Sequence, residues 1–577
     1  MKNITKILLI CFVSIVSACS DSFLNVDPPG ALQEGTLSTK QGVNSLLVGC
    51  YALLDGWGTS GGKFSSYQVG ADNWVYGSVA SDDAYKGTNA GDQPAISLIE
   101  QHLIQADNIY FLGKWRGMYD GIARTNDVLR VLANVTDATD AEKAQIAAEA
   151  RFLRGHYHFE LKKMYNMVPY VDEKTYDPNN LESTKLPNTE DIWAKIIDDL
   201  KAAYAVLPAS QSQPGRPTKY AAGAEIAKAY LFQKNHAAAR TYLEEIVASN
   251  KYSLKPLYHD NFKAVTNNNT ESIFEVQYSV NDGAPGGENG NIGSTLNYPY
   301  GGGGVTTCCG FFQPSQNLVN AFRTKDGFPL LTDFNAKDVI NDQGIKSADP
   351  FTPETGELDP RLDWTVGRRG IPFLDWGVHP GSNYVRDQAY GGPYSPKKHV
   401  MYRSDVGSNT FTGNPRLNAN NYRMIRYSHV LLWLAEVEVK ANNLDKARQL
   451  VNQIRKRAAN PDGFVKTAAG ANAANYVIKE YPAGHPYFAD AASALKAIQF
   501  EERLEFGMEG HRRFDLVRWD IAAQTLNAYY DAEGAKRTYL KGVKFVAGKH
   551  EYFPIPTDEI TYSQKGSSAT LKQNPGY

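Results

Sequence analysis

Two helical hairpins with the same internal spacing constrain the fold of this chain more than any other feature of its sequence. Ala227 and Ala239 lie on either side of a polar turn, and Ala435 and Ala447 do so at the same separation. Small residues let two antiparallel helices approach closely, and larger residues beside them fill the seam. This order is typical of tetratricopeptide-type hairpins. The sequence therefore predicts a helical-repeat scaffold, which presents surfaces for binding and has no chemistry of its own.

Four further stretches are also predicted to be helices, because their apolar residues recur three and four positions apart. They lie at about residues 42–54, 114–133, 141–165 and 189–206. We therefore expect a mainly α fold.

A long central stretch has a different character. Residues 281–422 are rich in Gly, Pro, Asn and aromatic side chains. Loops of this length are usually functional or disordered, and the aromatic content argues against disorder. We expect one domain over residues 37–577, with the helical scaffold at about 37–280 and 423–577. A loop-rich, irregular half with short β-strands would be inserted at about 281–422.

The N-terminus has the pattern of a bacterial lipoprotein signal. Lys2 and Lys6 precede an apolar run at residues 7–16 that is too short to span a bilayer, which takes about 20 residues. Val16-Ser17-Ala18-Cys19 then has the form of a lipobox. We predict a signal peptide at residues 1–18, an acylated Cys19, and a lipid-anchored tether at residues 19–36. The alternative is a plain signal peptide with an incidental cysteine.

The charge balance argues against a nucleic-acid-binding protein, and the spacing of the remaining cysteines argues against a redox or zinc site. Lys and Arg number 60 against 62 Asp and Glu, a net charge of −2, which argues against nucleic acid as a partner. Cys308 and Cys309 are adjacent and lack the C-x-x-C spacing of redox or zinc sites. They are either two buried thiols or a vicinal disulfide, and we expect a structural role.

No catalytic or metal-binding motif has positive support in the sequence. Glu501, Glu502 and Glu505 could suggest a glycosidase acid pair, but their spacing beside arginines favours ion pairs on a helix. His156 and His158 are two apart on a predicted helix, so they point in different directions and cannot share a metal ion. We predict a protein without enzymatic activity and without a cofactor. A structural calcium ion stays an open possibility that no motif supports.

Aromatic side chains in the loops are the candidate ligand-binding residues. A flat Trp or Tyr ring can cover the apolar face of a sugar, while a neighbouring Asn or Asp bonds its hydroxyls. The alternative is that these rings are core anchors that hold the loops in place. The candidate residues are Trp74 with Asn73 and Asp72, Tyr298 with Asn297, Trp376 with Asp375, and Tyr384 beside Asn383.

Several segments, in order along the chain, resemble the SusD/RagB family of surface lipoproteins that accompany TonB-dependent transporters. The strongest is residues 501–519, with Glu509-Gly510-His511-Arg512. The others are the lipobox followed by residues 23–29, residues 150–155 (ARFLRG), 215–219 (GRPTK), 425–436 and 553–577.

The resemblance implies a single SusD-like fold whose motifs, such as residues 501–519, hold the structure rather than bind ligand. It also implies a glycan-binding protein on the cell exterior, anchored in the outer membrane by lipid. Such a protein lies as a lid over a SusC-type TonB-dependent transporter and passes oligosaccharide or polysaccharide to it. The alternatives are a RagB-like lipoprotein of the same architecture that captures peptides, and a tetratricopeptide scaffold for periplasmic partners.

Overall fold

The fold is a stack of long helices with an irregular, loop-rich half beside it. The structure is a computed structural model that describes residues 37–58, 62–301 and 308–577. The predicted signal peptide (1–18), the acylation site Cys19 and the tether (19–36) lie outside the described residues.

Ten long helices of the described chain form the scaffold. They are α4 (Lys40–Ala52), α7 (Ile109–Leu132), α8 (Asp140–Tyr165), α9 (Trp193–Val206), α10 (Lys219–Phe232), α11 (His236–Ala248), α15 (Tyr427–Lys440), α16 (Leu444–Ala458), α17 (Ala491–Phe506) and α19 (Ala522–Glu533). Shorter helices are α5 (Ser66–Val69), the π-helical η3 (Trp74–Val79), α6 (Pro94–Glu100), α12 (Gln316–Ala321), α13 (Leu362–Thr365), α14 (Gln388–Gly391), α18 (Arg512–Arg518) and α20 (Thr557–Tyr562). Single 3₁₀ turns are η1 (Leu53–Asp55), η4 (Leu181–Thr184), η5 (Tyr258–Phe262), η6 (Ala264–Thr266), η7 (Pro285–Gly287), η8 (Ser382–Tyr384), η9 (Arg403–Asp405), η10 (Pro461–Gly463), η11 (Pro486–Phe488) and η12 (Thr538–Leu540).

The strands are short, and in the described chain they pair only two by two, always antiparallel. The longest pair joins the two halves of the scaffold, with Tyr422 opposite Val276. The pairs are β1 (Ala84–Gly87) with β3 (Phe311–Pro314), β2 (Ser272–Val276) with β10 (Tyr422–Arg426), β4 (Thr324–Lys325) with β5 (Phe328–Pro329), β6 (Val366–Gly367) with β7 (Ser395–Pro396), β8 (Thr410–Phe411) with β9 (Asn414–Asn418), and β11 (Gln564–Lys565) with β12 (Ser568–Ala569).

The two predicted hairpins are present as α10–α11 and α15–α16, and α11 packs directly against α15. Ala227, Ala239, Ala435 and Ala447 are all fully buried, so the small residues lie in the helix seams as expected. The turns also correspond, because Lys234 and Asn442 have positive φ values of 60° and 61° at matching positions. The predicted mainly helical fold with tetratricopeptide-like units is confirmed.

Helices α7 and α8 form the longest antiparallel pair of the scaffold. Helix α8 begins with a capping box, in which Thr139 and Glu142 each bond the backbone of the other. Gly121 on α7 permits the close approach, because a Cβ atom there would lie only 2.5 Å from the ring of Tyr157 on α8. Within the described residues, no helix combines the length and the apolar character that a membrane span needs.

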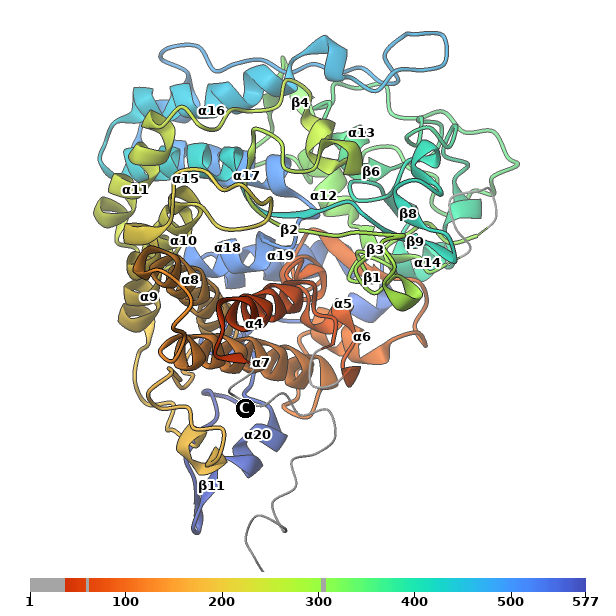
Figure 1. Ribbon diagram of the computed structural model, residues 1–577. Helices are drawn as coiled ribbons and strands as arrows, with labels where there is room; N and C mark the ends of the chain where they lie inside the picture. Colours follow the sequence, from red (N-terminus) through yellow and green to blue (C-terminus); the bar gives the residue numbers. More distant parts are fainter. Residues whose placement is uncertain (1–36, 59–61, 302–307) are drawn as a thin grey trace, which may run out of the picture.

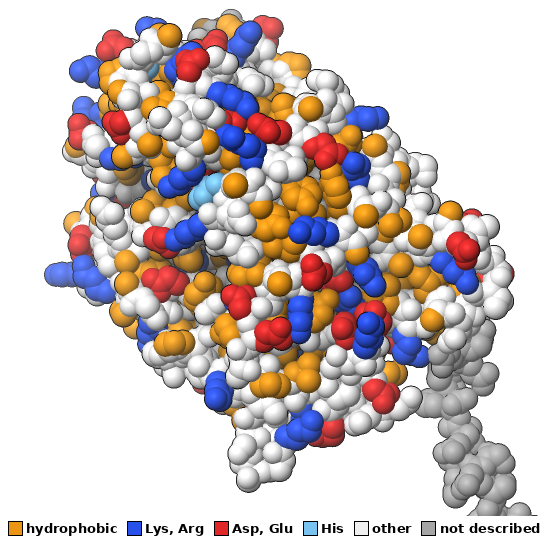
Figure 2. All heavy atoms as spheres, turned by 90° about the vertical axis from the view of Figure 1, so that its left-hand side faces the viewer, with side chains coloured by type: hydrophobic (Ala, Val, Ile, Leu, Met, Phe, Trp, Pro, Cys, Tyr) orange, Lys and Arg blue, Asp and Glu red, His pale blue; other side chains and the backbone are white. Residues whose placement is uncertain are grey.

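Apolar side chains also reach the outer face of the scaffold. In Figure 1 helices α9, α10 and α11 form the left edge, and Figure 2 shows that edge face-on, with apolar side chains gathered between charged ones. On these helices the half-buried Tyr242 meets Tyr204 edge to face at 5.2 Å and stacks with Tyr230 at 6.4 Å. This face of the hairpins is therefore partly covered by its own tyrosines.

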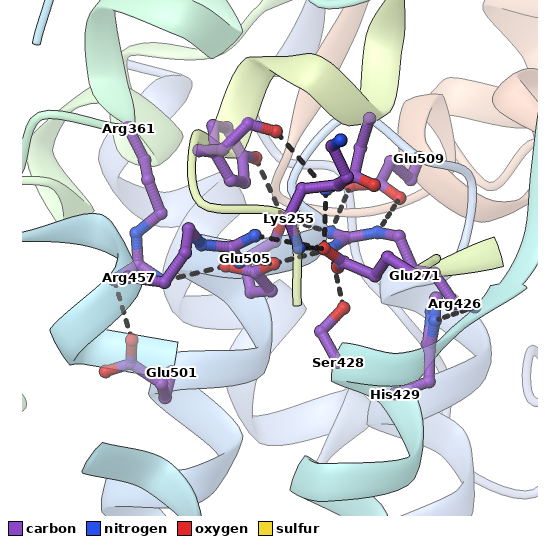
Figure 3. A network of polar contacts seen from close by, with 12 residues as sticks. Lys255, Glu271, Arg361, Arg426, Ser428, His429, Arg457, Glu501, Glu505 and Glu509 are labelled. Atoms are coloured by element: carbon purple, nitrogen blue, oxygen red, sulfur yellow. Dashed lines mark hydrogen bonds and ion pairs between the residues drawn. The ribbon is translucent and has the colours of Figure 1, made fainter. Parts of the chain in front are cut away.

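A buried network of ion pairs joins the loop-rich half to the helices (Figure 3). Arg426, at the end of β10, donates to three carboxylates: Glu271 at 2.9 Å, Glu505 at 2.5 Å and both oxygens of Glu509, at 2.9 and 3.1 Å. Arg457 on α16 also donates to Glu271 and Glu505. All five side chains are nearly or completely inaccessible to solvent.

Residues of the loop-rich half supply the other members of this network. Arg361 bonds Glu501 at 2.7 Å and Glu505 at 3.1 Å, so it ties its own loop to α17. Lys398 bonds Glu509 at 2.9 Å. Burial by itself would raise the pKa of Glu509, but Arg426 and Lys398 outweigh it and lower that pKa to about 2. The Glu509 carboxylate therefore stays ionised and paired inside the protein.

We expect Arg426→Met to destabilise the protein strongly, because it leaves three buried carboxylates without their shared partner. Breaking a buried pair in this way costs about 3–5 kcal/mol. Urea unfolding followed by circular dichroism measures the loss. Lys544→Met, which removes the exposed pair with Asp531, is the control and should change the midpoint little. Equal midpoints for Arg426→Met and the wild type would contradict this account.

Candidate functional site

Trp74 is a core residue rather than an exposed platform. Its indole ring is 2% exposed, packs against Phe311 and Phe312 at 6.3 and 5.5 Å, and donates from Nε1 to the carbonyl of Gly293 at 3.2 Å. The expectation that this ring faces solvent is wrong. Its role is that of a core anchor, the alternative considered from the sequence, because it joins η3 to the loop after residue 290.

The polar neighbours of Trp74 are also engaged inside the protein. Asn73 adopts a positive φ of 48° just before η3, and its side-chain amide donates to Ala71 and to Glu160 at 3.0 Å each. Asp72 is half-buried, and burial raises the pKa of its carboxyl group to about 6. Asn73 is thus committed to structure, while Asp72 borders a small cavity.

That cavity brings together candidate residues that are more than two hundred positions apart in sequence. Asp72, Trp74 and Asn297 line it, together with Lys398 and Glu509 of the buried network. Its volume is about 30 Å³. A buried water needs roughly 10–15 Å³ on this measure, so the cavity has room for a water or two and none for a sugar ring.

The other candidate rings meet in a second cluster. Tyr298 and Tyr384 are 1% and 4% exposed and pack with Phe373, Val400 and Met401. The hydroxyl of Tyr298 accepts from Asn418 at 2.8 Å and donates to the carbonyl of Arg416 at 3.2 Å. These two rings are therefore buried as well, and the expectation of solvent-facing phenols is wrong for both. Long loops form few backbone ladders, so apolar anchors such as these hold them in place.

Trp376 and Asp375 are the candidates that reach the surface. Trp376 is half-buried on the edge of the Tyr298 cluster, and its Nε1 donates to the carbonyl of Met401 at 3.0 Å. Asp375 is exposed and accepts from the backbone amides of Arg403 and Ser404 at 2.6 and 2.9 Å. Both side chains are held in place and keep part of their surface open to solvent.

Beside this cluster lies a polar surface that we did not predict from the sequence. Tyr300 is half-buried, and its backbone amide donates to the carbonyl of Tyr384 at 3.1 Å, which places residue 300 beside the buried cluster. The guanidinium of Arg386 lies 5.1 Å from the Tyr300 ring centre and donates to Thr88 at 2.9 Å and Asp92 at 2.8 Å. We call Asp92, Tyr300 and Arg386 the Tyr300 surface, and the buried Thr88 supports it from inside.

The sequence contains only a weak signal for this surface. Tyr298-Pro299-Tyr300 was recognisable as an aromatic loop, but nothing in it distinguishes the buried tyrosine from the half-exposed one. The partners of Tyr300 come from segments near residues 90 and 386, which only the fold brings together. The surface offers one aromatic ring, one guanidinium and one carboxylate, which suits a ligand with both apolar and hydroxyl groups.

The adjacent cysteines and the two histidines of α8 have structural partners. Cys308 and Cys309 form a disulfide, which decides between the two alternatives left open by the sequence. His156 bonds Glu225 at 3.2 Å, whereas His158 lies between the carbonyl of Arg154 and the amide of Val171. Among the described residues, no group of three or more His, Cys, Asp or Glu side chains could hold a metal ion.

The glutamates of α17 that could have suggested a glycosidase are held in ion pairs instead. Glu501 is bonded by Arg361 and Arg455, and Glu505 by Arg361, Arg426 and Arg457. Both side chains are completely buried. They are structural ion pairs, as the sequence indicated. Their partners are not the arginines close by in sequence, because Arg503 bonds Asp83 and Arg512 bonds Asp82.

We expect Trp74→Ala to act on stability, because the substitution empties a filled core position and removes a hydrogen bond. Replacing a buried Trp by Ala costs about 3–5 kcal/mol. Trp57→Ala is the matched control, since Trp57 is 39% exposed. Thermal and urea unfolding of both variants measure the difference. If the two variants unfold together, Trp74 is not the anchor described above.

Comparison with known proteins identifies the family to which this fold belongs. A sequence model described as the SusD family matches residues 270–577, more than half of the chain. A second, described as "Starch-binding associating with outer membrane", matches residues 22–231. Together they cover the whole loop-rich half and all of the helical scaffold except residues 232–269.

Individual relatives extend along most of the chain. SusD-like protein P25 of Formosa agariphila is 24% identical over 577 residues, 96% of each chain. The starch-binding protein SusD of Bacteroides thetaiotaomicron is 24% identical over 472 residues, 76% of this chain and 74% of that protein. Surface glycan-binding protein A from Bacteroides thetaiotaomicron, solved in complex with laminarihexaose, has the same fold, with a TM-score of 0.65 and 24% identity over 93% of this chain and 99% of its own. The protein belongs to the SusD family.

Proposed function

We propose that this protein is a non-enzymatic, cell-surface lipoprotein that captures oligosaccharide or polysaccharide and passes it to a SusC-type TonB-dependent transporter. Lipid on Cys19 would hold it at the outer membrane, facing the cell exterior. The observation that carries the proposal is the match, along nearly the whole chain, to proteins named for glycan binding, including one solved with laminarihexaose. The second family description also associates these proteins with the outer membrane.

The Tyr300 surface and the neighbouring Trp376 and Asp375 are the proposed ligand-binding residues. The ring of Tyr300 is backed by Arg386, and that guanidinium is itself fixed by Asp92. A ring that is already held in place loses little freedom when a sugar stacks on it. The buried Trp74, Tyr298 and Tyr384 support this region from below by fixing the loops that carry it.

Capture of peptides by the same architecture is the alternative function. A deep, narrow cavity lined by Asn and charged residues would favour peptides. The cavity at Asp72 and Asn297 has such a lining, but its volume of about 30 Å³ is too small for an amino-acid side chain in an extended peptide. The part-exposed ring and guanidinium of the Tyr300 surface favour sugars instead.

We expect Tyr300→Ala and Arg386→Ala to weaken glycan binding by about three- to tenfold each. A stacking contact contributes about 0.5–1.5 kcal/mol, and about 1.4 kcal/mol corresponds to a factor of ten in affinity. Affinity electrophoresis with laminarin, starch and other plant and algal polysaccharides, followed by calorimetry on those that bind, measures the change. Trp376→Ala should have an effect of similar direction.

Trp57→Ala serves as the control, because it removes an exposed ring outside the Tyr300 surface. Unfolding midpoints of all variants must match that of the wild type for the affinities to be compared. Absence of binding to every polysaccharide tested would refute the glycan proposal, and binding of extended peptides instead would support the alternative.

We expect Cys19→Ala to release the protein from the outer membrane, because the thiol is the proposed site of acylation. Metabolic labelling with palmitate and fractionation of cells measure the anchor, and protease treatment of intact cells measures exposure at the surface. The wild type should carry label and be cleaved on intact cells. A wild-type protein without label, or one shielded from protease, would contradict the proposed anchor or its orientation and would favour a periplasmic scaffold.

A further inference from the structure

The most exposed aromatic ring in the described ranges lies away from the Tyr300 surface. Tyr562, at the end of α20, is 63% exposed, compared with 39% for Trp57. An exposed ring of this kind was expected from the sequence at other positions. The Tyr562 side chain contributes little to the core, because most of its surface stays in contact with solvent.

Tyr562 stands on the rim of a groove of about 460 Å³. Helix α7 forms the floor through buried side chains such as Trp115 and Ile122. One wall is the segment that carries η4, and the other is the C-terminal segment with α20 and β11, which Figure 1 shows side by side below α7. Pockets of about 300–1,000 Å³ are the usual size for small ligands.

The Tyr562 ring is fixed from below rather than free to move. The guanidinium of Arg116 lies 5.4 Å from the ring centre. Arg116 is itself held by Glu559 at 2.7 Å and by Asp558 at 3.8 Å. A ring that is fixed on one face and open on the other is a preformed stacking surface, because binding has little side-chain freedom to remove.

Two more tyrosines face the same groove from different segments. Tyr119 comes from α7, and Tyr176 from the loop before η4. Both are half-buried, and the hydroxyl of Tyr119 donates to the carbonyl of Pro169 at 2.8 Å. Three tyrosine rings from three parts of the chain thus border one groove. Residues that are neighbours in sequence, or that share one face of a helix, could not produce this arrangement.

Positive and negative side chains are equal in number on the rim of the groove, which indicates a neutral ligand. Arg116 and Lys185 stand against Asp120 and Glu559 among the lining residues. Each already has an opposite partner, as in the pair of Lys185 with Glu182 at 2.6 Å and of Asp120 with Arg124 at 3.1 Å. An ionic ligand would have to compete with these pairs, whereas neutral hydroxyl groups can use the remaining lone pairs and N–H groups.

We propose that the groove between η4 and α20 is a second carbohydrate-binding site, with Tyr562 as the stacking ring. Aromatic rings would cover the apolar face of a neutral sugar, and Arg116, Asp120 and Glu559 would bond its hydroxyls. The inference rests on the proposed glycan function and names a further site for the same class of ligand. Two sites on one chain raise the avidity for a long polysaccharide without any new contact.

The test uses the mature full-length chain and a panel of hexasaccharides: laminari-, malto-, cello-, xylo- and mannohexaose. Calorimetry compares the wild type with Tyr562→Ala, Arg386→Ala and the double variant. We expect two sites in the wild type, one of them weakened about three- to tenfold in each single variant, and both weakened in the double variant. For the parent polysaccharide of the hexasaccharide that binds, Tyr562→Ala should also lower the overall affinity, because avidity is lost.

Two further variants test whether loss of the Tyr562 ring, and not another change in the protein, causes the loss of affinity. Tyr562→Phe keeps the stacking surface and should retain two sites of unchanged affinity. Trp57→Ala removes an exposed ring outside the groove and should change nothing. Since Tyr562 is mostly exposed, Tyr562→Ala should keep the unfolding midpoint of the wild type.

The outcomes distinguish this inference from the proposed function. Binding that Arg386→Ala weakens and Tyr562→Ala leaves unchanged would overturn the second site while the glycan function stands. Binding that Tyr562→Ala weakens would support the groove, whether or not the Tyr300 surface contributes. No binding to any hexasaccharide or polysaccharide would refute both.

Discussion

The structure depends on the buried ion pairs around Arg426. One guanidinium bonds Glu271, Glu505 and Glu509, and through them it connects the strand β10, the helix α17 and the segment before β2. Arg361 and Lys398 extend the same network into the loop-rich half. Buried charges are costly unless paired, so separating the segments that meet in this network would leave uncompensated charges in the core. The loop-rich half depends on these ion pairs, because its short strands form too few backbone hydrogen bonds to hold its segments in place.

The helical scaffold and the loops therefore play different physical roles. Matched hairpins such as α10–α11 and α15–α16 bury small residues in their seams and form a rigid support. The loops gain their order from apolar anchors, among them Trp74 and Tyr298, and from the ion pairs below them. Rings that remain open to solvent, such as Tyr300 and Tyr562, are held from one side by an arginine. In both cases the ring is positioned before any ligand arrives.

The helical part of the fold was predictable, whereas the exposure of individual rings was not. The spacing of Ala227 to Ala239 is a local property of the chain, and local periodicity determines which side of a helix is buried. Burial of Trp74 depends on Phe311 and Phe312, which are more than two hundred residues away, and no local pattern records that contact. The flanking Asn73 and Asp72 looked like a polar rim for a sugar, but Asn73 instead bonds Glu160 on α8. A polar neighbour in sequence is thus no guide to solvent exposure in a long loop.

Periodicity and short motifs are properties of neighbouring residues, so they were enough to predict the mainly helical architecture, the tetratricopeptide-like hairpins and the resemblance to the SusD/RagB family. The sequence also indicated that Glu501 and Glu505 are ion-paired, but not with which arginines, because the neighbouring Arg503 bonds Asp83 instead. The folded chain was needed to show which arginines pair with these two glutamates, which aromatic rings are buried, and where a groove forms beside Tyr562. These features arise where distant segments meet, and long-range contact is the information that a linear pattern does not contain.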